Sequence, residues 1–165
     1  MRLNTKKLDR IVQNFIRKVS ADKNLKAFLD TDFNYYYYSK KVGYSILVSE
    51  RMDSLFLEYA FLHGLKVDCG IFALSLLHEV GHHMTIEGIN QSTYDFCQEV
   101  KETLTDSDED ANAYFDLEDE RLATKWAIDY INTHVKEVED FTVKFSEALA
   151  EFVEKYDIDF LSDYY

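Results

Sequence analysis

The stretch Cys69–Met84, CGIFALSLLHEVGHHM, contains the most apolar segment of the sequence and, directly after it, three of its five histidines. Asp68 can cap a helix that starts here, and the residues through Leu77 are apolar nearly all round, so the stretch predicts a central buried helix. It ends with two histidines four positions apart, His78 and His82, which a helix places about 5–6 Å from each other at Cβ. The sequence therefore predicts a buried helix with a polar group at its end.

The polar group has the pattern H-E-x-x-H, formed by His78, Glu79 and His82. Two imidazoles on adjacent turns can converge on one metal ion, while Glu79, about 100° further round the helix, can face a water held by that ion. Zinc suits this pattern, because two imidazoles and one carboxylate leave a fourth tetrahedral position for water. We therefore predict a Zn²⁺ site with His78 and His82 as ligands and Glu79 as general base. The alternative is a pair of core histidines hydrogen-bonded to carboxylates.

The third protein ligand of such a site has to come from elsewhere in the chain, because no histidine follows His82 at a ligand spacing. A carboxylate is expected, and helical phase favours Glu120, which shares a face with the small residues Ala123 and Ala127. Asp108 is the alternative on the same reasoning, although its shorter side chain needs a closer approach. The sequence thus predicts Glu120 as the third ligand, with Asp108 left open.

Two residues inside and beside the motif have other predicted roles. Gly81 lies within the helix, where glycine costs up to about 1 kcal/mol relative to alanine, so another element or a ligand is expected to pack closely there. His83 points away from the direction of His82, and we expect it at the surface or behind the ligands.

HEVGH, together with the stretch ERLATKWA that starts at Glu120, resembles the ImmA/IrrE-type metallopeptidases. These are gluzincins, in which H-E-x-x-H on one helix is completed by a glutamate in an E-x-x-A-x-x-F/W-A setting on a later helix. The resemblance covers roughly residues 44–131 and implies zinc ligation by His78, His82 and Glu120, with Glu79 as general base. It also implies a zincin-like fold and a bacterial or phage-encoded protease that cleaves an intracellular regulatory protein.

The rest of the chain predicts an α+β domain that is mostly helical. Helices are expected over residues 8–19, 53–62, about 94–104, 108–134 and the last amphipathic stretch, with a shorter helix after Ser20. A hairpin is expected over Phe33–Val48, with Gly43 at its turn, and Val67 is expected to complete a short edge strand. We expect this small N-terminal sheet to pack on the active-site helix, within one domain spanning residues 1–165.

Composition narrows the classes of function. The 165 residues carry a net charge of −13 and are 47% hydrophobic, so a folded core is expected, whereas binding to nucleic acid or to an anionic membrane is not. Two cysteines are too few for a disulfide framework, and residues 1–10 lack the apolar core of a secretory signal, which favours a cytoplasmic protein. No apolar run approaches the roughly 20 residues of a membrane span.

The predicted function is hydrolysis of peptide bonds by a metal-activated water, on a protein or peptide substrate for which the charge favours cationic segments. Tyr35–Tyr38 are candidates for an edge that binds extended peptide, and these tyrosines, Tyr44 and Tyr59 are all candidates for a donor to the oxyanion. The alternative function is an acidic interaction or inhibitor protein, such as a phage-type nucleic-acid mimic, with a vestigial metal site. The sequence does not predict an oligomeric state.

Overall fold

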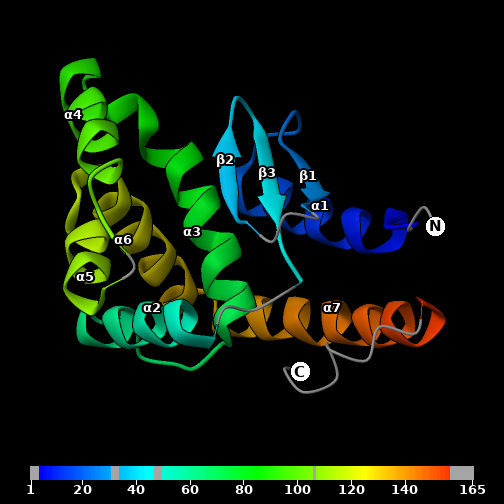
Figure 1. Ribbon diagram of the computed structural model, residues 1–165. Coiled ribbons are helices and arrows are strands. Elements are labelled where there is room, and N and C mark those ends of the chain that lie inside the picture. The colour runs from blue at the N-terminus through cyan, green and yellow to red at the C-terminus, as the bar shows by residue number, and fades with distance from the viewer. Residues whose placement is uncertain (1–3, 31–33, 47–49, 106, 157–165) are drawn as a thin grey trace. The chain divides into compact units, whose positions relative to one another are not determined.

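The computed structural model describes residues 4–30, 34–46, 50–105 and 107–156 (Figure 1). Contacts between Cα atoms divide the chain into two units. Unit 1 comprises Met1–Val48 and His134–Tyr165, and unit 2 comprises Ser49–Thr133. The described residues are mostly helical with one small three-stranded sheet, which confirms the α+β prediction at this coarse level.

The elements of unit 1 are α1 (Lys6–Ser20), β1 (Lys26–Leu29), β2 (Tyr36–Tyr38), β3 (Lys41–Tyr44) and α7 (Val135–Tyr156). Those of unit 2 are α2 (Glu50–Leu62), α3 (Ile71–Thr85), the short 3₁₀ helix η1 (Ile86–Gly88), α4 (Gln91–Lys101), α5 (Asp108–Asp116) and α6 (Glu118–Thr133). Among these helices, none combines the length and the apolar character that crossing a bilayer requires.

In unit 1, α1 packs against both β1 and α7 (Figure 1). Its buried face repeats at helical spacing, and the Phe15 ring stacks on that of Phe141 with centroids 3.9 Å apart. Asp9 connects α1 to the sheet, since its Oδ1 accepts hydrogen bonds from the Leu29 N–H (3.1 Å) and the Tyr44 hydroxyl (2.7 Å). The sheet is thereby fixed on one side of α1.

The sheet has the order β1-β3-β2, with β1 parallel to β3 and β2 antiparallel to it. The predicted hairpin is present, but its turn is at Ser39 and Lys40, whose φ values of 46° and 65° suit a two-residue turn. The prediction that Gly43 forms the turn is wrong. Gly43 lies in β3 opposite Tyr36, and a Cβ there would be 2.5 Å from the Tyr36 ring. The ends of the predicted hairpin, Phe33 and Val48, lie outside the described residues.

Three other expectations about local structure are wrong. The short helix expected after Ser20 is replaced by β1, because the chain reverses at Ala21 (φ 55°) and Leu25 is buried beside the new strand. Val67 belongs to a bend and not to a strand. The acidic stretch 108–134 forms two helices, since Leu117 takes an extended conformation (ψ 141°) between α5 and α6.

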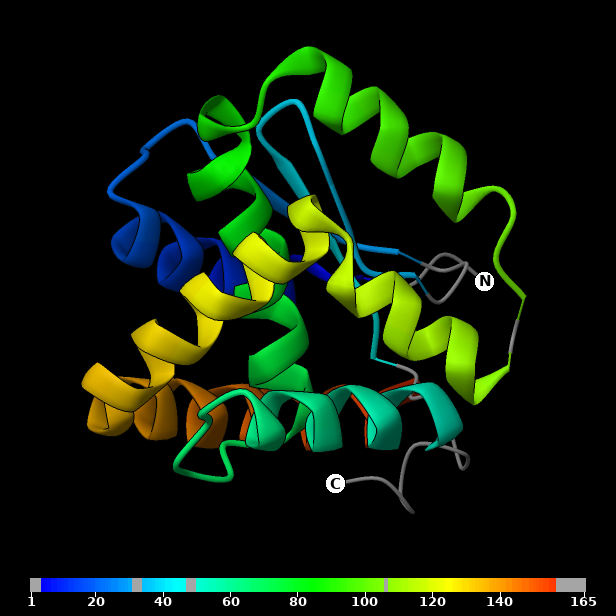
Figure 2. The same ribbon diagram turned by 90° about the vertical axis from the view of Figure 1, so that its left-hand side faces the viewer.

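Unit 2 is built around α3, the predicted buried helix. Its residues from Phe72 to Gly81 are all buried, and α6 lies against it (Figure 2). The two helices touch at Gly81, where a Cβ would be 2.4 Å from the carbonyl oxygen of Ala123. The expectation that Gly81 marks a close approach of another element is therefore confirmed. Asp68 does not cap α3 directly, because its side chain accepts the Gly70 N–H (2.9 Å) one residue before the helix begins.

Candidate metal centre

The two histidines of the motif lie one turn apart near the C-terminal end of α3. His78 is 7% exposed, and its ring meets that of Phe56 on α2 edge to face, with centroids 5.2 Å apart. His82 is half-buried. Because both residues belong to one helix whose apolar part is fully packed, their Cβ positions are fixed by the backbone and the imidazoles point the same way.

Glu120 comes from the first turn of α6. The extended Leu117 starts a new helix two residues before Glu120, and this places the carboxylate near the positive end of the helix dipole. The side chain is 2% exposed. Since Glu120 shares its face with Ala123, where Gly81 allows contact, the short distance between the helices brings the carboxylate to the histidines.

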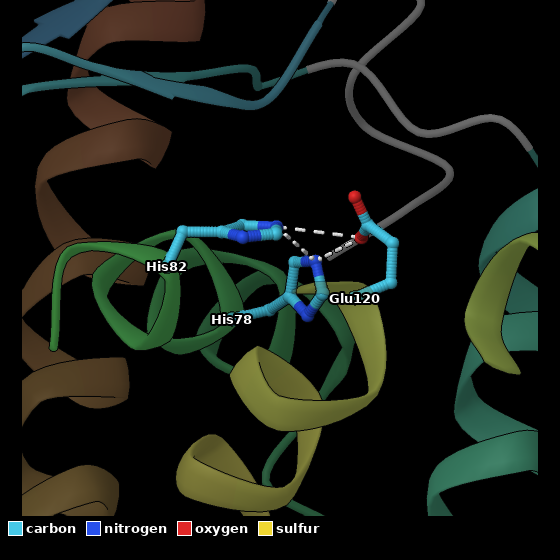
Figure 3. Close-up of side chains that lie close together, drawn as sticks. All are labelled: His78, His82 and Glu120. Atoms are coloured by element: carbon cyan, nitrogen blue, oxygen red, sulfur yellow. Dashed lines mark hydrogen bonds and ion pairs between the residues drawn. The ribbon is translucent and has the colours of Figure 1, made fainter. Parts of the chain in front are cut away.

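The three side chains meet at one point (Figure 3). Glu120 Oε2 lies 2.8 Å from His78 Nε2 and 3.3 Å from His82 Nε2, and the two nitrogens are 3.1 Å apart. Ligands about 2.0–2.1 Å from one Zn²⁺ in a tetrahedron stand roughly 3.3 Å from each other. The donor triangle thus has the size and the chemistry of three ligands of a small divalent cation, and it could hold one.

The second nitrogen of His78 is also engaged. Its Nδ1 lies 3.0 Å from the hydroxyl oxygen of Thr124, which is buried on α6 one turn after Glu120. A histidine that binds a metal through Nε2 carries its proton on Nδ1, and a fixed acceptor for that proton orients the ring. Thr124 supplies this acceptor. Its spacing of four from Glu120 is the sequence signal that could have identified it.

Glu79, the predicted general base, is 8% exposed. Burial raises the pKa of its carboxyl group above the usual value, against the opposing charges of His78 and His82. A raised pKa favours the protonated form of the carboxyl group, as is typical of carboxylates that exchange protons in active sites.

Glu120 and His82 shift each other's titration. Burial opposes ionisation of Glu120, but hydrogen bonds to His78 and His82 outweigh burial and hold its pKa well below the usual range. Burial likewise disfavours protonated His82, yet the hydrogen bond and charge of Glu120 outweigh it and raise the pKa of His82. Without a bound cation, the carboxylate thus favours the protonated form of His82.

Sequence reasoning missed three polar residues around Glu120. Lys101, the last residue of α4, places its Nζ 2.6 Å from Glu120 Oε1 and 2.5 Å from Asp119 Oδ2. Asp119 is 2% exposed. Burial, and then the nearby Glu120 carboxylate, raise the pKa of the Tyr114 phenol on α5. No spacing pattern connects Lys101 or Tyr114 to the motif, because they come from other helices.

The other candidate site residues from the sequence lie outside the donor group. Asp108 is exposed and pairs with Arg51, so the structure brings Glu120 and not Asp108 to the histidines. His83 is half-buried and outside the donor group. The Tyr59 hydroxyl donates to Asp116 Oδ1 (2.7 Å), while the hydroxyl of Tyr44 donates to Asp9 in unit 1.

The predicted peptide-binding edge also belongs to unit 1. There Tyr36–Tyr38 form β2, which is an edge strand of the sheet. Tyr35 precedes β2, and its hydroxyl donates to the carbonyl oxygen of Ser45 (2.8 Å).

The net charge of the chain resides in unit 2. Its sequence, Ser49–Thr133, holds 18 acidic and 5 basic residues, a difference of −13, whereas the segments of unit 1 hold 13 of each sign. The negative charge is therefore not spread evenly over the chain, and the unit that contains the histidines is strongly anionic.

Comparisons with protein-family models, with curated proteins and with solved structures found no match to this chain.

Proposed function

We propose that this chain is a zinc-dependent endopeptidase of zincin type that hydrolyses peptide bonds of an intracellular protein. The observation that carries the proposal is the donor triangle of His78, His82 and Glu120, with edges of 2.8, 3.1 and 3.3 Å. Glu79, adjacent to the first ligand, completes the set of groups that a gluzincin of the ImmA/IrrE type uses. Membership of that family is part of the proposal.

The formal charge of the buried group supports a divalent cation. Three carboxylates are buried in this part of unit 2. Glu120 contacts both histidines, Glu79 is next to His78 in the chain, and Asp119 shares Lys101 with Glu120. In the state that binds a metal the imidazoles are neutral, and with all three carboxylates ionised the group then has a formal charge of −2. Because buried charges are costly unless they are compensated, a divalent ion held by the triangle would stabilise the fully ionised group.

The residues of the chain divide the work of hydrolysis as follows. His78, His82 and Glu120 would hold Zn²⁺, which when bound supplies the positive charge that acidifies a water molecule and polarises the scissile carbonyl. Glu79 would accept a proton from the water molecule while the oxygen of that water bonds to the carbonyl carbon. It would then return the proton to the leaving amine when the C–N bond breaks. Thr124 keeps the ring of His78 in the orientation that presents Nε2.

The test is metal analysis combined with a peptidase assay. We expect one zinc per chain in the native protein and cleavage of a mixture of internally quenched peptides. Glu79→Gln should keep the zinc and lose cleavage, whereas His78→Ala and His82→Ala should lose both. His83→Ala is the matched control, since it removes the neighbouring imidazole outside the donor group and should change neither.

A native protein that contains no metal and takes up none would overturn the proposal. The chain would then fit the alternative of an acidic interaction protein. Zinc bound without any cleavage would instead place the protein among metal-binding proteins with a vestigial site.

A further inference from the structure

Lys101 contacts the one oxygen of Glu120 that does not face the histidines. Oε2 points at the two imidazoles, whereas Oε1 accepts from Lys101 Nζ at 2.6 Å. Figure 3 shows this second oxygen directed away from both rings. The two oxygens of one carboxylate are therefore already divided between two kinds of partner.

The ammonium group is itself held in place. Lys101 Nζ also bonds to Asp119 Oδ2, which accepts a further hydrogen bond from the Gln98 side chain at 3.1 Å, and the ammonium lies 5.3 Å from the centroid of the Tyr114 ring. The Lys101 side chain is 18% exposed. A lysine with two buried carboxylate partners and an aromatic face has lost most of the freedom that a surface lysine keeps.

We propose that Lys101 is a positioning residue that makes Glu120 a one-oxygen ligand. The ammonium occupies Oε1, so Glu120 would offer a bound cation Oε2 alone, and the protein would supply three donor atoms. This inference rests on the proposed function, because it concerns how the metal is held.

This role follows from the two ways in which a carboxylate can bind a metal. A carboxylate beside a metal can bind through one oxygen or through both. If Glu120 used both oxygens, the protein would supply four donor atoms, and a bound water would be the fifth donor instead of the fourth. A hydrogen bond from a charged donor is among the stronger ones in proteins, so the pair with Lys101 can compete with the metal for Oε1.

The experiment uses Co²⁺ in place of zinc, because its visible absorption reports coordination number. Wild type saturated with Co²⁺ is expected to show the intense bands of a four-coordinate site. Lys101→Met keeps the length of the side chain and removes its charge. The ion should then gain Glu120 Oε1 as a fifth donor, and the absorption should fall about twofold or more, since such sites can be four- or five-coordinate. Lys101→Arg, which can still donate to both carboxylates, should retain the wild-type spectrum.

Two further variants separate positioning from folding. Lys101→Met leaves Asp119 without its cation, so the double variant K101M/D119N removes that unpaired charge and should show the same loss of intensity. Lys125→Met changes an exposed lysine of α6 and should leave the spectrum unchanged. A purely structural lysine would lower the melting temperature of the metal-free K101M protein without changing the spectrum of the saturated one.

The outcomes distinguish this inference from the proposed function. If wild type binds Co²⁺ and Zn²⁺ but K101M and K101M/D119N keep its spectrum, Lys101 does not position Glu120, and the peptidase proposal is untouched. If wild type binds neither ion, the proposed function itself fails and this inference with it.

Discussion

At the scale of single residues, the site depends on which carboxylate reaches the histidines. Helical phase ranked Glu120 above Asp108 from the sequence alone, and the structure brings Glu120 to the two imidazoles. Phase could do this because Glu120 shares a face with small residues, and only such a face approaches another helix closely. It could not reveal Lys101, whose ammonium reaches Glu120 from α4 through a contact that no local pattern encodes.

Replacing the two carboxylates should therefore have unequal effects. Glu120→Gln keeps the volume but removes the charge that faces both histidines, and we expect it to weaken Zn²⁺ binding by more than the roughly 10–100-fold that changes behind the ligands produce. Asp108→Asn breaks only an exposed pair with Arg51 and should leave zinc affinity within experimental error. Competition titration with a chromophoric chelator measures both, and equal losses would contradict the assignment.

Tyr44 gives a prediction about alkaline pH. It is 0% exposed, donates to Asp9 at 2.7 Å, and burial raises the pKa of its phenol above the ordinary value near 10. A raised folded-state pKa contributes stability that is complete below the unfolded-state value and is lost as pH rises above it. The melting temperature of the wild type should therefore decline above about pH 10.

Tyr44→Phe should remove part of that decline, because phenylalanine has no proton to lose. At neutral pH the same variant should be less stable by about 1.5–3 kcal/mol, the usual value of a hydrogen bond to a charged group. Tyr38→Phe, at a side chain that is 73% exposed, is the control and should follow the wild type. Thermal unfolding between pH 7 and about pH 11 is the measurement, and parallel curves for all three proteins would refute the role of Tyr44.

At the scale of elements, long helices with an apolar face were predictable, whereas the strands were predictable only in part. The ends of α3 were predicted to within two residues, because a long apolar run with polar residues on both sides marks where a buried helix begins and ends. β1 was missed, since its four residues pair in parallel with β3 and such pairing leaves no local signal. Gly43 was read as a turn residue, yet it is needed to make room for the Tyr36 ring.

The close contact between α3 and α6 should be sensitive to a side chain at position 81. Gly81→Ala places a Cβ 2.4 Å from the Ala123 carbonyl oxygen, so the helices must separate. Overpacking typically destabilises by about 1–3 kcal/mol, which exceeds the up to about 1 kcal/mol gained in helix propensity. We expect a lower melting temperature together with weaker zinc binding, because the ligands sit on both helices.

Gly88→Ala is the matched control for this variant. It adds the same methyl group in η1, where nothing lies within 4 Å of the added atom, and should leave melting and zinc affinity unchanged. Thermal unfolding and zinc titration check both proteins. A Gly81→Ala protein that binds zinc as the wild type does would show that the helix separation does not set the donor triangle.

At the scale of the whole molecule, the net negative charge and the donor group belong to the same unit. Ser49–Thr133 carries the entire net charge of −13 and also all residues of the donor group. The total charge could be counted from the sequence, but this division could not be predicted. Unit 1 joins two segments from opposite ends of the chain, and only the tertiary structure shows that they belong together.

An anionic unit around the site predicts a salt-dependent preference for cationic peptides. A Lys/Arg-rich peptide should be cleaved with a kcat/KM that falls as salt shortens the Debye length from about 30 Å at 0.01 M to about 8 Å at 0.15 M. A peptide of equal length with glutamine in place of each basic residue should show little change. The measurement is the cleavage rate of both peptides as a function of salt concentration. A rate that does not depend on salt for either peptide would refute electrostatic steering.

The contact at Gly81 also bears on how relatives of this chain are to be recognised. The neighbouring Val80 is fully buried, and another aliphatic side chain of similar size can replace it. Position 81 instead faces main-chain atoms of α6, which can move away only if Glu120 moves with them. A distant homologue that keeps the same arrangement should thus read H-E-x-G-H in place of the looser H-E-x-x-H. That fourth fixed letter offers a more selective signature for searching genomes than the histidines alone.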